Sequence, residues 1–482
     1  MASTMITAPE LPATLQWVNT ERPLQLSELR GKIVLLHFWT SGCIHCMHMM
    51  PDLKYLESKY RDNLVVIGIH SPRFPHDKLK SCVLKAINRF HIRHPVAHDP
   101  IMRVWTKYGI KSWPAIVFID AEGHVIGKLG GEGRRKQLDS LIQEHIDKAE
   151  KKGILSNQHI GTLRKQEPES VLSFPGKLFA TENHLYISDS GHNRVIEVNQ
   201  HGRVMRSFGS GSQGLLDGDA TGASFDNPQG LVKLNNYLYV ADTGNHAIRR
   251  IDLQSNEVIT IAGDGKIGKG GNQISSDPLA LSLNSPWDVC IHGSDLYIAM
   301  AGWHQIWKMD LMQNSLVSIS GSGKSDMQDG SSQVASMAQP SGLSVGDYCL
   351  YVADSQSSSV RVVRLPGGQV STLIGKSISS SGDKDGGWSQ AQLQHPQAVV
   401  SNLKQGQIYI ADTYNNKIKL MDEGSKGIKT LDSKNLLDEP SGLSMTSDTL
   451  WIANTNKHEI VKMNLLTRKF EVLELNEPVI EF

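Results

Sequence analysis

Ile33-Val34-Leu35-Leu36-His37-Phe38-Trp39, with Cys43-Ile44-His45-Cys46 shortly after it, joins an apolar strand to two closely spaced thiols. A strand that ends in a short turn bearing C-x-x-C places the thiols at the N-terminus of the following helix. The positive end of the helix dipole and the unpaired N–H groups there favour a thiolate, which is the reactive form of cysteine. Cys43 is therefore the predicted nucleophile, and Cys46 is its predicted resolving partner.

Residues 1–150 alternate between strand-like and helix-like segments. Apolar, β-branched runs predict strands at Ile33–Phe38, Leu64–His70 and Ala115–Ile119. Helices are expected at residues 44–60, 77–90 and Lys136–Lys151. This alternation predicts an α/β domain with helices on both faces of a sheet. The polar passage 151–168 is the expected linker to the rest of the chain.

The length of 482 residues, with 39% hydrophobic residues, indicates two or three domains. Five cysteines in a chain of this size do not make a disulfide framework, and a lone C-x-x-C suggests redox or metal chemistry in a reducing, cytoplasmic setting. We expect no secretory signal and no membrane span, because no long apolar run is present. Residues 161–482 carry 27 basic against 34 acidic residues, which disfavours nucleic-acid binding.

From about residue 170 onward the sequence repeats. A block of the form P-x-G-L, or a variant of it, begins at Pro175, Pro228, Pro286, Pro340, Pro396 and Pro440. Each block is followed by a strand of the form L-Y-I/V-A-D, a polar turn and a further alternating strand. A unit of four short strands cannot bury its faces alone, so repeats of this kind close radially. We predict an all-β, six-bladed β-propeller over residues 169–482.

The N-terminal segment, from "LSELRGKIVLLHFWTSGCIHC" to Pro51, resembles the thioredoxin superfamily and its TlpA-like branch. The resemblance implies that Cys43 attacks a disulfide, that Cys46 resolves the mixed disulfide, and that Pro114 is a cis proline beside the pair. It also implies a substrate groove near Trp39, Gly42 and Trp113. Gly42, His37 and Trp113 all depart from the residues usual in that family.

The repeats resemble NHL repeats, and the fusion resembles the family of NHL repeat-containing protein 2 and its bacterial and plant relatives. Blade 3 departs from its siblings at Met300, Trp303, His304 and Trp307. Positions that break a repeat are where a binding site is expected, although packing explains the same residue types. The aspartates that end the repeated strands, by contrast, are expected to fix turns rather than bind ligands.

Several interpretations of the cysteine motif remain open. His45 either stabilises the Cys43 thiolate or is an incidental exposed residue, and His37 is expected to be a satisfied core residue rather than a proton shuttle. The dithiol is either redox-active or vestigial. A minor alternative is a zinc site made by Cys43, His45, Cys46 and His48, but no second ligand pair appears, and we expect no metal. Buried, unreactive thiols are expected at Cys82, Cys290 and Cys349.

The sequence thus predicts a thiol–disulfide oxidoreductase that needs no cofactor beyond its own Cys43–Cys46 disulfide. Its expected partners are a protein or small-molecule thiol or disulfide and a protein bound by the propeller. One alternative is a non-catalytic scaffold or binding protein with a vestigial thioredoxin site. A less favoured alternative is a metal-dependent hydrolase built on the propeller.

Overall fold

The structure is a computed structural model that describes residues 6–156, 158, 160–163, 168–270 and 274–476. The chain divides into two compact units, residues 1–168 and 169–482. Among the described residues, no helix is both long and apolar enough to cross a membrane.

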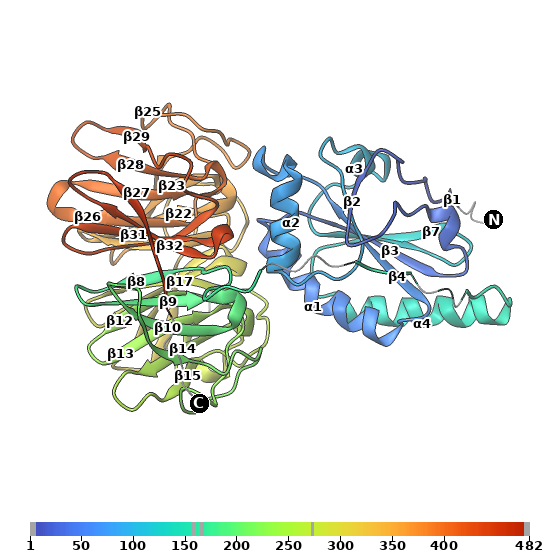
Figure 1. Ribbon diagram of the computed structural model, residues 1–482, viewed down its shortest axis with the longest axis horizontal. Coiled ribbons are helices and arrows are strands. Elements are labelled where there is room, and N and C mark those ends of the chain that lie inside the picture. Colours follow the sequence, from blue (N-terminus) through green and yellow to red (C-terminus); the bar gives the residue numbers. More distant parts are fainter. Residues whose placement is uncertain (1–5, 157, 159, 164–167, 271–273, 477–482) are drawn as a thin grey trace. The chain divides into compact units, whose positions relative to one another are not determined.

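The first unit is a thioredoxin-like domain built on a mixed sheet of order β1-β7-β6-β3-β4-β5-β2 (Figure 1). The parallel pairs are β3 with β4 and β4 with β5, and the other neighbours are antiparallel. The strands are β1 Ile6–Thr7, β2 Gln16–Val18, β3 Ile33–Trp39, β4 Leu64–His70, β5 Val96–His98, β6 Ala115–Ile119 and β7 His124–Gly130. The helices are α1 Ile44–Lys59, α2 Lys80–Arg89, α3 Arg103–Lys107 and α4 Arg135–Lys151.

Each face of this sheet has its own apolar core. On one face Leu35 and Phe118 pack against Leu53 of α1 and Ile142 of α4. On the other face the alternate residues of β3 and β4 pack with Val104 of α3 and with the N-terminal segment. Because both faces are covered, β3 and β4 are buried along their whole length, which explains their continuous apolar sequences.

The strands predicted at Leu64–His70 and Ala115–Ile119 are confirmed, and β3 extends one residue beyond its prediction. The sequence analysis missed β1, β2, β5, β7 and α3. All except β7 are too short to show a period, and β7 is half exposed with two glycines in it. β5 forms a strand because it pairs with β4, and β7 forms a strand because it pairs with β6.

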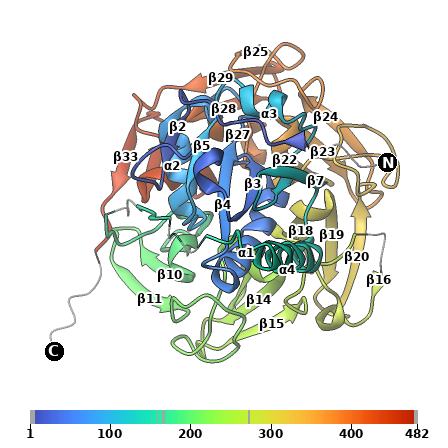
Figure 2. The ribbon, with the colours of Figure 1, turned by 90° about the vertical axis from the view of Figure 1, so that its right-hand side faces the viewer.

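The second unit is a six-bladed propeller, as predicted (Figure 2). Blade 1 contains β8 Leu178–Ala180, β9 His184–Asp189, β10 Arg194–Asn199 and β11 Val204–Phe208. Blade 2 contains β12 Pro228–Leu234, β13 Tyr237–Asp242, β14 Ala247–Asp252 and β15 Val258–Ala262. Blade 3 contains β17 Pro286–His292, β18 Asp295–Met300, β19 Gln305–Asp310 and β20 Ser315–Ser320, with the short β16 Ile274–Ser275 at its outer edge.

The other three blades repeat this plan. Blade 4 contains β21 Pro340–Gly346, β22 Cys349–Asp354, β23 Ser359–Arg364 and β24 Val370–Ile374. Blade 5 contains β26 Ala398–Asn402, β27 Gln407–Asp412, β28 Lys417–Asp422 and β29 Gly427–Leu431, with β25 Gly386–Gly387 outside it. Blade 6 contains β30 Pro440–Met445, β31 Thr449–Asn454, β32 Glu459–Asn464 and β33 Phe470–Leu473. The first strands of neighbouring blades adjoin around the ring, and β30 returns to β8.

A buried lysine joins four blades near the propeller axis. The ammonium of Lys177, beside the first strand of blade 1, donates to the Ser341 carbonyl oxygen at 2.7 Å and to the Gln397 carbonyl oxygen. It also pairs with Asp288 at 3.3 Å. A buried charge is tolerated only with such partners, so the lysine ties together the inner ends of blades 1, 3, 4 and 5.

A repeated hydrogen bond links each blade to the next. The turn after the second strand of every blade ends in a non-glycine residue in the left-handed region, and its side chain accepts a backbone N–H from the following blade. The six acceptor–donor pairs are Asn193–Asn227, His246–Ser285, His304–Gln339, Ser358–His395, Asn416–Glu439 and His458–Phe174, at 2.8–3.2 Å. We call these contacts the blade latches.

The last latch closes the ring. His458 of blade 6 accepts the N–H of Phe174 at 3.0 Å, and the two rings contact with centroids 4.3 Å apart. Asn476 also pairs with Arg203 beside blade 1. Among the described residues no strand is exchanged between blades 1 and 6, and these contacts join the two blades together with the hydroxyls of Ser441 and Thr455, which donate to the Gly176 and Pro175 carbonyl oxygens.

The closing latch can be tested with acceptors that the chain itself uses. His458→Asn keeps an acceptor that tolerates the left-handed backbone, as at Asn193 and Asn416, whereas His458→Gly keeps the backbone and removes the acceptor. We expect the glycine variant to lose about 1–3 kcal/mol more stability than the asparagine variant, the cost of an unpaired buried N–H. Equal urea midpoints for the two variants would contradict a role for the acceptor.

Candidate functional site

Cys43 caps the N-terminus of α1. Its sulfur accepts the backbone N–H of Cys46 at 3.3 Å, so the first turn of the helix is fixed around the thiol. Cys43 is 9% exposed and Cys46 is 1% exposed, and both are free thiols. Both lie in an apolar cluster with Val83 and Ile87 of α2. Cys43, as the more exposed of the two, is the nearer to the surface.

The two thiols differ in acidity. A hydrogen bond from the Cys46 side chain lowers the pKa of Cys43, and the charges of His45 and Arg73 add to this effect against the opposing effect of burial. Burial raises the pKa of Cys46 well above its ordinary value, and the hydrogen bond to Cys43 acts in the same direction. The geometry therefore favours a thiolate at Cys43 and a protonated thiol at Cys46.

His45, His48 and Glu132 form a hydrogen-bonded cluster, which we call the Glu132 hub. His45 and His48 extend from α1, and Glu132 lies in the loop between β7 and α4. Oε2 of Glu132 meets Nδ1 of His45 at 3.0 Å and also meets Nδ1 of His48. Burial alone would lower the pKa of His45, but the hydrogen bond and charge of Glu132 raise it. His45 thus has a specific carboxylate partner within the domain.

The sequence analysis missed Arg73, Asp77 and Glu132. Asp77 is fully buried and accepts hydrogen bonds from the hydroxyls of Thr40, at 3.0 Å, and Ser41, at 2.6 Å. It therefore fixes the turn that leads into Cys43. Arg73 and Asp77 follow β4, the parallel neighbour of β3, and the carboxyl ends of such strands share an edge. That rule could have identified both residues, whereas no local pattern marks Glu132.

Two predicted groove residues have different environments. The Trp113–Pro114 peptide bond is cis, as the resemblance implied. Trp113 packs against the cluster that contains both cysteines, and its ring nitrogen donates to the Ser71 carbonyl oxygen at 3.0 Å. Trp39 is 0% exposed, so its place in a substrate groove is wrong: as the last residue of β3 it belongs to the core.

His37 is buried but not satisfied, which corrects the expectation for this residue. Neither ring nitrogen has a hydrogen-bond partner in the described structure, and the side chain is 0% exposed. Burial lowers the pKa of His37 to about 3, with a further contribution from His94. The ring is therefore neutral in the folded chain at neutral pH.

The four ligands of the alternative zinc site do not come together as one group. In the described part of the chain, the ligand atoms of His45, His48 and Glu132 lie within 4.8 Å of one another, but neither cysteine sulfur belongs to that group. The three side chains already satisfy one another by hydrogen bonds.

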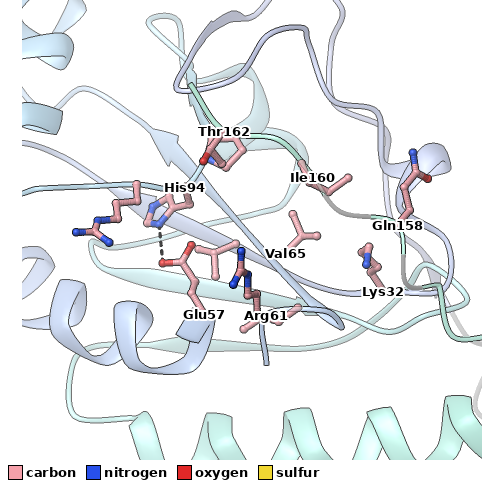
Figure 3. Close-up of a pocket in the computed structure, with 12 residues that line it drawn as sticks. Lys32, Glu57, Arg61, Val65, His94, Gln158, Ile160 and Thr162 are labelled. Carbon is pink, nitrogen blue, oxygen red and sulfur yellow. Dashed lines mark hydrogen bonds and ion pairs between the residues drawn. The ribbon is translucent and has the colours of Figure 1, made fainter. Parts of the chain in front are cut away.

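The same unit has a cavity of about 160 Å³ (Figure 3). It is lined by residues at the start of β4, such as Val65, whereas Cys43 follows the far end of the neighbouring parallel strand β3. Figure 3 also shows the pair that Glu57 makes with His94, at 3.3 Å. The cavity therefore does not form part of the dithiol site.

The residues that make blade 3 unusual form packed core. Met300, Trp303, His304 and Trp307 are all at most 5% exposed. The two tryptophan rings lie 4.9 Å apart, and their nitrogens donate to Gly268 and Gln305 at 3.0 Å. The prediction of a propeller site at these four residues is therefore wrong, because they fill the blade instead of lining a pocket.

Strand register explains the exception. Blade 2 pairs Asp242 with Arg249, both fully buried and 2.9 Å apart. Blades 4 and 5 repeat this with Asp354–Arg361 and Asp412–Lys419. At the equivalent positions blade 3 has Met300 and Trp307, so an apolar pair replaces an ion pair.

The repeated acids, and Asn454 in blade 6, also hold the chain that enters the blade in every blade except blade 3. Asp242 accepts the N–H of Asp226 at 2.8 Å, and Asp189, Asp354, Asp412 and Asn454 make the equivalent bond. Their structural role is confirmed. The expected contacts within the turn are also present, since the turn side chains Asn245, Ser357 and Asn415 donate to Asp242, Asp354 and Asp412 at 2.6–2.7 Å.

The ion pair in blade 2 can be tested by comparison with blade 6, which has the uncharged residues Asn454 and Val461 at the equivalent positions. Arg249→Val leaves the Asp242 carboxylate buried without its cation, which costs about 3–5 kcal/mol. We expect Asp242→Asn combined with Arg249→Val to recover part of that loss in chemical denaturation. A double variant no more stable than the single one would contradict this account.

His37 makes a pH-dependent contribution that can also be tested. Its pKa of about 3 lies below the unfolded value, so below about pH 6.5 the unfolded chain binds a proton that the folded chain does not. As the pH decreases through that range, the free energy of unfolding decreases by up to about 1.4 kcal/mol per pH unit because of this group. His37→Leu should flatten the fall in calorimetric midpoint of the first unit between about pH 6.5 and pH 4.5. An unchanged slope would show that His37 does not titrate in this way.

Comparison with known proteins agrees with the architecture. A family model described as thioredoxin-like matches residues 31–125. NHL repeat-containing protein 2 from Homo sapiens is 36% identical over 98% of this chain and 72% of its own length. Protein SUPPRESSOR OF QUENCHING 1, chloroplastic, from Arabidopsis thaliana is 40% identical over 96% of this chain and 47% of its own length. Thiol-disulfide oxidoreductase ResA from Bacillus thuringiensis is 28% identical over 26% of this chain and 69% of its own length.

Proposed function

This chain belongs to the family of NHL repeat-containing protein 2, and we propose that it is a thiol–disulfide oxidoreductase whose active dithiol is Cys43 and Cys46. The observation that carries the proposal is the placement of the two thiols: the Cys43 sulfur lies at the N-terminus of α1, where it accepts the Cys46 N–H at 3.3 Å, and Cys46 is the more deeply buried of the pair. The similarity of the first unit to a thiol-disulfide oxidoreductase supports the same chemistry.

The proposed reaction is thiol–disulfide exchange. The Cys43 thiolate attacks a client disulfide, a mixed disulfide forms, and one client sulfur leaves as a thiolate. Cys46 then loses its proton and attacks the Cys43 sulfur, which releases the second client thiolate. The client is reduced and Cys43–Cys46 becomes a disulfide, which an external dithiol must reduce before the next turnover. No other cofactor is needed for these steps.

The propeller is proposed to bind the client or a protein partner, in a cytoplasmic setting without nucleic acid or membrane. The alternative is a scaffold in which the dithiol is idle and the propeller alone acts. The hydrolase alternative has little support. In the described part of the propeller, no three metal-binding side chains of the propeller alone come within 4.8 Å of one another. Asp288, near the axis, is already paired with Lys177.

Equilibration of the full chain in glutathione buffers of graded potential tests the proposal, with Cys43→Ser and Cys46→Ser as controls. We expect one reversible two-electron transition that both variants abolish. At about pH 7, Cys43 should be alkylated at least tenfold faster than Cys290, whose thiol is buried and has a raised pKa.

Two results would contradict the oxidoreductase proposal. One is the absence of any transition over the whole range of potentials. The other is alkylation of Cys43 no faster than that of Cys290. Either result would favour the scaffold alternative.

A further inference from the structure

We propose that Glu132 is a positioning residue for the dithiol, holding the His45 imidazolium beside Cys43 through a carboxylate that it shares with His48. The inference rests on the proposed function and deepens it, because it assigns the control of Cys43 reactivity to a residue outside the C-x-x-C motif. Glu132 lies in the sequence Gly130-Gly131-Glu132-Gly133, far from the cysteines along the chain.

The geometry of the hub supports this role. One oxygen, Oε2, meets Nδ1 of both histidines, so both rings are turned toward the loop between β7 and α4. His48 is 6% exposed at its side chain, whereas His45 is 30% exposed and Glu132 is 24% exposed. His48 therefore holds the carboxylate from the buried side, and His45 is the more exposed partner that the carboxylate orients.

The charge of Glu132 also favours a protonated His45. Titratable groups near the hub in the described structure include Cys46 and Asp52, which both interact with Glu132, Arg73, which acts on Cys43, and Arg135, which acts on Asp52. Burial alone would raise the pKa of Glu132, but the hydrogen bonds from His45 and His48 hold it well below its usual range, so the carboxylate is ionised at neutral pH. An ionised partner makes the hydrogen bond to His45 charge-assisted and favours the imidazolium.

Glu132 has two opposing routes to Cys43, and they predict opposite signs. Through His45 it keeps a positive charge beside the sulfur and favours the thiolate. Its own negative charge acts directly against thiolates, as its contribution to the raised pKa of Cys46 indicates. If the route through His45 dominates, removing the charge of Glu132 makes Cys43 less reactive at low pH, and if the direct route dominates, it makes Cys43 more reactive.

The test is the pH profile of Cys43 alkylation by iodoacetamide in the reduced full chain, followed at the Cys43 peptide by mass spectrometry. We expect Glu132→Gln to slow alkylation roughly five- to tenfold at about pH 6, in line with the loss of a charge-assisted hydrogen bond, and to leave the rate at about pH 9.5 unchanged. In glutathione buffer the same variant should shift toward the disulfide, because the reduced form has lost stabilisation.

Matched variants separate this role from a merely structural one. Glu57→Gln removes a carboxylate from another glutamate–histidine pair on α1, away from the cysteines, and should leave the profile unchanged (Figure 3). Glu132→Asp keeps the charge and should restore part of the reactivity. In a His45→Asn background only the direct route remains, so Glu132→Gln should no longer slow alkylation. If Glu132→Gln does not fold, Glu132→Asp and His45→Asn supply the comparison, and both should slow alkylation at about pH 6.

Three outcomes would overturn the inference: a Glu132→Gln profile identical to the wild type, faster alkylation at about pH 6, or an equal effect with and without His45. Failure of the proposed function is recognised separately. It appears as the absence of a reversible disulfide in the wild-type chain, whereas the alkylation profile of Cys43 still reports on Glu132.

Discussion

Buried polar groups in this protein need partners, and that constraint organises both units. In the propeller a buried carboxylate at the end of the second strand accepts a backbone N–H from the chain entering the blade, and in three blades it also pairs with a buried cation. The blade latches satisfy a further backbone N–H between each pair of neighbours. Because a buried donor or charge without a partner is costly, these contacts fix the loops that the apolar core alone would leave loosely specified.

In the thioredoxin-like unit some buried polar groups have hydrogen-bond partners and others do not, and examples of both lie in or next to the strand that leads to the dithiol. Asp77 holds the turn before Cys43 with two hydroxyl hydrogen bonds, while His37 within β3 has no partner in the described structure. Cys43 has a helix N-terminus and nearby positive charges, and Cys46 has burial. Unequal surroundings of two chemically identical groups are the physical basis of an attacking and a resolving thiol.

Blade 3 shows that the same position can be satisfied in another way. Met300 and Trp307 replace an acid and a base, and the tryptophan nitrogen then finds its own acceptor in Gln305. From the sequence, this departure from the repeat is compatible with a binding site or with packing, and the burial of both side chains shows that it is packing. The burial and hydrogen bonds of residues that depart from a repeat must therefore be known before a function is assigned to them.

The sequence by itself determined the two folds, the blade number and the C-x-x-C pair, because these depend on local periodicity, on repetition and on a short motif with a defined spacing. The cis proline was implied only by the resemblance to the thioredoxin superfamily. Only the tertiary structure decided that Trp39 and the blade 3 residues are core, that His37 is unpaired, and that Glu132 meets His45 and His48. These facts depend on contacts between segments far apart in the chain, and no local pattern encodes which distant side chain will meet a given polar group. The composition of the motif specified the chemistry, and the packing around it set the charges that tune that chemistry.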